Sequence, residues 1–148
     1  EERVWDFSEY STEVKCDVSG SNPQVFDYNG FTISLANNAS DDDHDKVTSD
    51  GVYWRGGASS GNTTRYIAFT PLQNGTLYAT GKLNANGGRW GISSSLDVNS
   101  FACGTESTQS TSYSTVQVEC TAGNIYYIFA KGKSATVNNI KFTPETTE

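Results

Sequence analysis

Arginine side chains next to aromatic rings are the residues of this chain whose types and spacing could do chemistry. Arg55 follows Tyr53 and Trp54, while Arg65 precedes a tyrosine and Arg89 precedes a tryptophan. A guanidinium can hold a carboxylate through two parallel hydrogen bonds, and an aromatic ring can pack against the C–H face of a sugar. These residue types predict a surface for carboxylated sugars, in which the arginines contact carboxylates and Tyr53 or Trp54 packs against a sugar face.

The same arginines have a second interpretation, which is ion pairing with the protein's own acidic residues. Arg55 and Arg89 can point outward if Trp54 and Trp90 point inward, because neighbours on a strand face opposite sides of a sheet. Arg65 shares a face with the apolar residues of its predicted strand, so it must lie at the strand end or be paired when buried. Trp90 is expected in the core, and Trp54 could lie in the core or on the surface.

The titratable residues do not favour catalysis. His44 is the one histidine; it lies in the acidic stretch DDDHDK, and no nucleophile motif such as GxSxG occurs. Most carboxylates fall in the segment 41–50 or near the termini, where no strand would hold two of them rigidly across a cleft. We therefore expect no catalytic residues, with a small lyase or hydrolase as an alternative.

The acidic segment also raises the question of a metal ion. It offers hard oxygen ligands of the kind that calcium takes, namely Asp41, Asp42, Asp43, Asp45 and Asp50. The glycine and glutamate that an EF-hand needs are not in place, and a run of aspartates is more often a solvated surface segment. We expect no cofactor, and a structural calcium ion is the alternative.

Alternation of apolar and polar residues, with turn residues between the runs, organises the chain. The alternating runs cover 4–7, 30–36, 64–70, 75–81, 88–93, 114–120, 124–130 and 136–142. Asn74 and Gly75 predict a hairpin turn between two of them. The predicted fold class is all-β, an antiparallel two-sheet β-sandwich of jelly-roll type with eight or nine strands, and a closed barrel is the alternative.

Length and charge limit the organisation of the chain and its partners. The 148 residues suit one domain, and we expect a module over 1–143 followed by the start of a linker over 144–148. The net charge of −7 argues against nucleic acid or an anionic membrane as a partner, since both need an extended basic face. No apolar run is long enough for a transmembrane helix.

The cysteines leave two possibilities open. The chain has three, Cys16, Cys103 and Cys120, and no CxxC motif that would indicate zinc. Cys103 and Cys120 could form a disulfide if their strands pair. Three buried thiols that behave as small apolar side chains are an equal alternative.

Several short motifs follow one another in a recognisable order: VWDFSEY, NGFTISLANN, TRYIAFTPLQNGTLYATGK, GRWGIS and TVNNIKFTP. This order resembles the β-sandwich carbohydrate-binding modules that accompany bacterial pectate lyases and other enzymes that degrade plant cell walls. The resemblance spans nearly the whole chain. It implies a non-catalytic, secreted or cell-surface module, monomeric and covalently linked to a catalytic or dockerin module, with pectin of the homogalacturonan type as the favoured ligand.

In such pectin-directed modules, binding is expected to rest on basic side chains more than on an aromatic platform. Arg65 of TRYIAF and Arg89 of GRWGIS match the basic positions, and Arg55 of YWRGG matches less closely. Lys131 and Lys133 of FAKGK belong to no motif, but they lie in the predicted turn before the last strand and could join the site.

The acidity of the chain and its segment 37–50 depart from the pattern that the resemblance implies, and this leaves two further functions open. One is binding of a neutral β-glucan, mannan or xylan through Tyr53 and Trp54. The other is a structural or adhesion module of a cell-surface or multi-enzyme assembly, which would bind no glycan.

Overall fold

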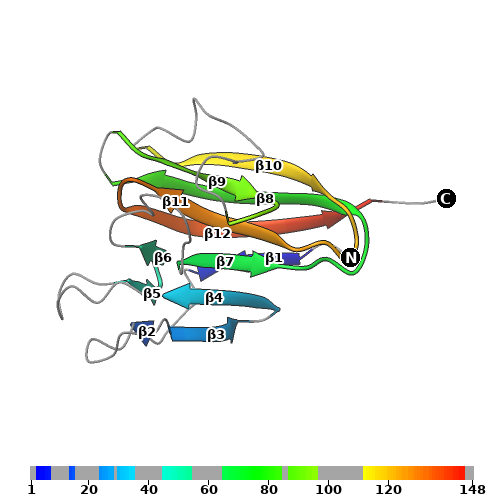
Figure 1. The fold of residues 1–148 in the computed structure, drawn as a ribbon, viewed down its shortest axis with the longest axis horizontal. Helices are drawn as coiled ribbons and strands as arrows, with labels where there is room; N and C mark the ends of the chain where they lie inside the picture. Colours follow the sequence, from blue (N-terminus) through cyan, green and yellow to red (C-terminus); the bar gives the residue numbers. More distant parts are fainter. Residues whose placement is uncertain are drawn as a thin grey trace.

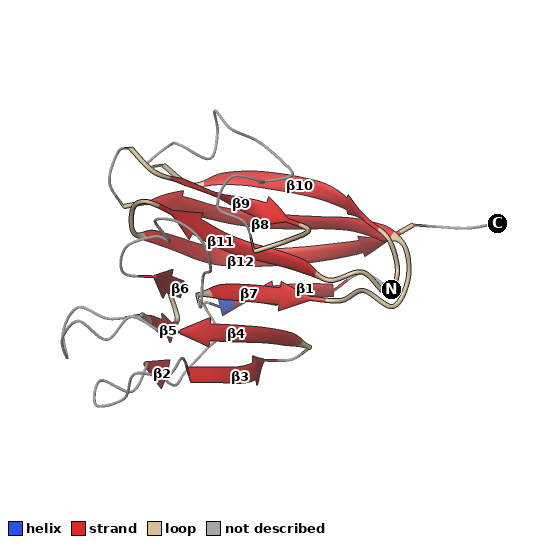
Figure 2. Ribbon diagram, viewed as in Figure 1, coloured by secondary structure: helices blue, strands red, loops and turns tan. Residues whose placement is uncertain are grey.

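Strands make up most of the structure. The computed structural model describes residues 3–7, 14–15, 24–28, 30–35, 45–54, 65–84, 87–96 and 112–145. Within these ranges it contains twelve strands and no α-helix, and Figure 2 shows the strands in two layers. The prediction of an all-β, antiparallel two-sheet sandwich is confirmed.

The larger sheet has seven strands in the described part of the chain (Figure 1). Their order is β10-β8-β12-β6-β5-β2, and β1 also pairs with β12. The strands are β1 (Arg3–Asp6), β2 (Val14–Lys15), β5 (Lys46–Thr48), β6 (Gly51–Trp54), β8 (Gly75–Leu83), β10 (Ser114–Cys120) and β12 (Ala135–Pro144). β8 pairs with one edge of β12 along its length, while β6 and then β1 share the other edge.

The smaller sheet has five strands among the described residues, in the order β3-β4-β7-β11-β9. They are β3 (Gln24–Tyr28), β4 (Phe31–Leu35), β7 (Tyr66–Phe69), β9 (Arg89–Ser93) and β11 (Tyr126–Lys131). Every pairing in both sheets is antiparallel. β9 therefore forms one edge of this sheet, next to β11.

Large rings fill the core between the sheets. Trp5 of the larger sheet packs against Phe31 of the smaller sheet with ring centroids 4.1 Å apart, and Phe69 lies 5.3 Å from Phe142 in the same way. Aromatic side chains bury much area each, which suits a chain in which 35% of the residues are hydrophobic. Along β8 every second residue is buried, so the alternate side chains form an outer face.

Two details differ from the predictions. The prediction of a hairpin turn at Asn74-Gly75 is wrong, because β7 and β8 lie in different sheets. The segment between them crosses from one layer to the other. Gly75 has no positive φ; instead, the carbonyl of Asn74 accepts from the Glu145 amide and its side chain accepts from the Ala122 amide. The strand number is also higher than predicted, since β2, β3, β5 and β6 were not among the alternating runs.

Cys120 is a free, buried cysteine at the end of β10, and its thiol donates a hydrogen bond to the Val118 carbonyl at 3.8 Å. Cys120 therefore does not form the disulfide with Cys103 that was one of the two predicted possibilities. Cys103 and Cys16 lie outside the described residues. Burial raises the pKa of the Cys120 thiol to about 11, against a lowering by its hydrogen bond with the backbone of Leu77.

Candidate functional site

β6 places the two aromatic residues that were predicted to pack against a sugar, Tyr53 and Trp54, on opposite faces of the sheet. Its burial alternates, so Val52 and Trp54 face the core while Tyr53 faces outward. The side chain of Trp54 is 1% exposed and belongs to the main core cluster. Trp54 is therefore a core residue whose ring is closed to a sugar, whereas Tyr53 stays at the surface.

Arg65 pairs with an acid of its own chain. Its Nη1 atom lies 3.9 Å from Oδ1 of Asp45, and the two side chains are 15% and 0% exposed. Arg65 directly precedes β7 of the smaller sheet, and Asp45 directly precedes β5 of the larger one. The ion pair thus joins the two sheets between these strand starts, which removes Arg65 from the set of surface cations.

Asp45 was also among the aspartates predicted as calcium ligands. Its carboxylate is buried against Arg65, and the described residues contain no group of three or more histidines, cysteines or acids that could hold a metal ion. Asp41, Asp42 and Asp43 lie outside the described ranges, as does Arg55.

The three other predicted cations form one group, which we call the rim cluster: Arg89, Lys131 and Lys133. Arg89 on β9 is exposed and stands directly opposite Lys131 on β11, which places both side chains on the same face of the smaller sheet. Lys133 is exposed in the turn that leads from β11 to β12. The cluster therefore lies at the edge of the smaller sheet where β9 begins.

Two glycines hold this turn close to β9. A Cβ atom at Gly88 would come within 2.7 Å of the Lys131 carbonyl and 2.8 Å of the Lys133 Cβ, while one at Gly87 would lie 3.5 Å from the Lys133 Cε. Gly87 also has a φ of +100°, a conformation that favours glycine. The stem of Lys133 consequently packs over the two glycines that precede Arg89.

The larger sheet carries a second group of cations that the sequence analysis did not select. On its outer face three lysines lie over tyrosine rings, with distances from Nζ to the ring centroid of 4.6 Å for Lys141 over Tyr78, 5.0 Å for Lys82 over Tyr113 and 5.9 Å for Lys46 over Tyr53. The residues around them bear hydroxyl groups, and Thr80 and Thr115 share a hydrogen bond of 2.8 Å. This part of the outer face therefore carries lysines, tyrosine rings and hydroxyl groups.

One of these pairs could have been found from the sequence. Lys46 and Tyr53 stand opposite each other because β5 and β6 form a hairpin, with Thr48 opposite Gly51 around Ser49 and Asp50. The stretch KVTSDGVYW carries this signal as two short runs around a turn sequence. The other pairs join strands that are distant in the sequence, so only the sheet register reveals them.

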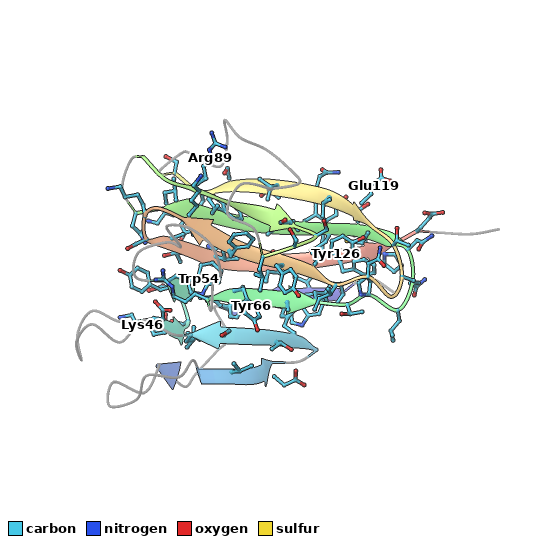
Figure 3. The ribbon with its side chains drawn as sticks, viewed as in Figure 1. Lys46, Trp54, Tyr66, Arg89, Glu119 and Tyr126 are labelled. Carbon is cyan, nitrogen blue, oxygen red and sulfur yellow. The ribbon has the colours of Figure 1, made fainter. Side chains whose placement is uncertain are left out.

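The basic and acidic ends of the molecule are separate. Figure 3 shows Lys46 and Arg89 toward one end of the long axis and Glu119 toward the other. Glu119 and Glu145 line an open polar groove of about 420 Å³, together with Asn74, Thr76, Thr121 and Thr143. Both glutamates are exposed. None of the described residues forms a helix with the length and apolar character to cross a membrane.

Comparison with solved structures finds distant similarities, among them the following. One is to the K1 cleaved adhesin domain of Lys-gingipain from Porphyromonas gingivalis W83, with a TM-score of 0.42, 9% identity, and 99% of each chain covered. The other is to the C-terminal CBM6 of LamC, a marine laminarinase from Zobellia galactanivorans, with a TM-score of 0.34, 13% identity, and 97% of this chain and 99% of that chain covered. No family model and no curated protein matches the sequence. The strand pairing shows the β-sandwich fold, and the exposed side chains of the two sheets carry the functional information.

Proposed function

We propose that this domain is a non-catalytic carbohydrate-binding module that holds a covalently linked enzyme on plant cell-wall polysaccharide, with pectin of the homogalacturonan type as its ligand. In this proposal the module works outside the cell as a monomer, and its partner module is a polysaccharide lyase, a glycoside hydrolase or a dockerin. The observation that carries the proposal is the rim cluster, because the strand register places Arg89 and Lys131 side by side on one face.

Arg89 and Lys131 stand directly opposite each other on neighbouring strands. Like charges in this arrangement destabilise a sheet, and Lys133 follows two residues after Lys131 with its stem against the glycines that precede Arg89. A bound carboxylate would offset this repulsion, and Arg89 can hold it through two hydrogen bonds. A polymer with a carboxylate on successive sugar units supplies such anions at short intervals, which a neutral β-glucan or xylan does not.

Affinity electrophoresis and titration calorimetry test the proposal with demethylated pectin, highly methyl-esterified pectin, β-glucan and xylan. We expect retardation by demethylated pectin and none by the neutral glycans. Arg89→Ala should weaken binding about tenfold, or about 1.4 kcal/mol, with unchanged unfolding because the side chain is exposed. Glu119→Gln, at the other end of the molecule, is the matched surface control and should leave binding within about twofold.

The charge on β9 could instead serve only to keep this edge strand from pairing with another chain. In that case Arg89→Ala would increase self-association without any change in pectin binding. Unchanged pectin binding by Arg89→Ala would refute the rim cluster as a pectin site. A wild-type protein that is not retarded by demethylated pectin would refute it as well.

A further inference from the structure

We propose that the outer face of the larger sheet is a second binding surface, on which a carboxylated polysaccharide chain lies across the strands along one row of side chains. The row, called here the transverse row, consists of Tyr113, Lys82, Thr136, Tyr53 and Lys46. The inference rests on the proposed function in its choice of ligand class, and it adds a site that shares no residue with the rim cluster.

The sheet register builds this row. Lys82 stands opposite Thr136, Thr136 opposite Tyr53, and Tyr53 opposite Lys46, across β8, β12, β6 and β5. Ser114 stands opposite Gly81, so the next position, Tyr113, falls beside Lys82, and the Lys82 ammonium lies 5.0 Å from its ring centroid. Because neighbouring strands are about 4.8 Å apart, the five positions span about 19 Å, which is room for a chain of a few sugar units.

Each end of the row pairs an ammonium with a tyrosine ring. Lys82 lies over Tyr113, and Lys46 lies over Tyr53 at 5.9 Å. The ring faces thus hold cations, which leaves them poorly suited to stack a neutral sugar but well suited to present a positive charge to a carboxylate. Between them Thr136 is only 8% exposed, and its hydroxyl oxygen accepts a hydrogen bond from Asn84 Nδ2 at 3.4 Å. The row therefore presents an ammonium group and a tyrosine ring at each end, with a largely buried position between them.

The spacing of the lysines defines which polymer the row would take. Lys82 on β8 and Lys46 on β5 are three strands apart in the sheet order, or about 14 Å. This distance exceeds the length of one sugar unit, so the two lysines bind carboxylates from different units, and the units between them need no charge. The row should accordingly accept partly methyl-esterified pectin, whereas the adjacent cations of the rim cluster favour continuous runs of free carboxylates.

A carboxylate lies near the row, in the turn between β5 and β6. Asp50, in the turn between β5 and β6, helps to raise the pKa of Tyr113, although burial is the larger cause. A negative charge at this position opposes an anionic ligand. Its removal should therefore strengthen binding, which a merely structural row would not do.

The test compares the wild type, three variants of the larger sheet and Arg89→Ala of the rim cluster by calorimetry on partly and fully demethylated pectin. We expect Lys46→Ala combined with Lys82→Ala to weaken binding of partly esterified pectin at least about tenfold, and Asp50→Asn to strengthen it two- to threefold. Lys141→Ala is the matched control, since Lys141 also lies over a tyrosine but about 13 Å along the strands from the row, and it should change binding less than about twofold.

Circular dichroism establishes that each variant is folded, and Lys82→Gln, which keeps part of the stem, replaces Lys82→Ala if that variant unfolds. Unchanged binding by the row variants together with a loss in Arg89→Ala would overturn the transverse row and leave the proposed function standing. A loss in the row variants with unchanged binding by Arg89→Ala would support the row and refute the rim cluster. A wild-type protein that binds neither pectin would overturn both.

Discussion

Removal of the Arg65 side chain should destabilise the domain without a direct effect on ligand binding. Arg65 is 15% exposed and its Nη1 lies 3.9 Å from the fully buried Asp45 carboxylate. Arg65→Ala leaves this carboxylate without its cation between the two sheets. A buried charge that loses its partner costs far more than a surface ion pair contributes.

The magnitude follows from the geometry. At 3.9 Å and an effective dielectric constant of about 20, the attraction between the two charges is about 4 kcal/mol. Partial exposure of Arg65 reduces it, while loss of the partner adds the desolvation cost of Asp45, and measured losses for broken buried pairs are about 3–5 kcal/mol. We therefore expect Arg65→Ala to lower the free energy of unfolding by about 3 kcal/mol, a large part of the total stability of about 5–15 kcal/mol.

Urea denaturation, followed by tryptophan fluorescence, measures this change. With a dependence on urea of about 2 kcal/mol per molar, the midpoint should fall by about 1.5 M. The addition of Asp45→Asn removes the unpaired charge, so the double variant should be more stable than Arg65→Ala alone. Stability within about 0.5 kcal/mol of the wild type, combined with a loss of pectin retardation, would refute this reasoning and return Arg65 to the ligand site.

Three further predictions concern the turn at β6, the buried thiol and the effect of salt. Gly51→Ala should lower the free energy of unfolding by at least about 2 kcal/mol. The reason is that Gly51 has a φ of +119° and a Cβ there would overlap the Val137 carbonyl oxygen. A Gly51→Ala variant that unfolds at the wild-type urea midpoint would contradict this prediction. Burial raises the pKa of Cys120 from 9.0 to about 11. The protonated thiol therefore contributes its full share of folding stability below pH 9, and this share is lost as the pH rises through 11. The difference in unfolding free energy between wild type and Cys120→Ser should shrink over this range, and a pH-independent difference would count against it. An increase in ionic strength from about 0.01 M to about 0.5 M should weaken pectin binding at least about tenfold, and calorimetry showing an unchanged affinity would exclude recognition by charge.

The sequence predicts the fold best where one face of a strand is buried. The alternating run over 114–120 coincides with β10, because from Thr115 to Cys120 polar residues alternate with apolar ones. β5 has a single apolar residue, Val47, and so gives no alternation. In β3, Val25 is 52% exposed and stands next to Phe26 in the sequence, so apolar residues there do not mark one face.

The site is less predictable, because a sequence shows which side chains are present but not which ones meet. The partner of Arg65 is an aspartate in the other sheet, and no local pattern pairs the two. Lys82 and Tyr113 meet only through the pairing of β8 with β10. Arg89 and Lys131 could be selected as basic residues, but the register of two strands distant in sequence is what places them together.

An acidic protein can still recognise an acidic polymer when part of its negative charge lies far from the cations that would bind it. Lys82 and Thr76 are six residues apart on β8, or about 20 Å, and Thr76 lines the groove that contains Glu119 and Glu145. The Debye length at physiological ionic strength is about 8 Å, so these exposed carboxylates are largely screened from a ligand at the basic end. The net charge of −7 then favours solubility and disfavours non-specific adsorption to polyanions. In the proposed function, the local cations that lie over tyrosine rings or face each other in the sheet register select the ligand.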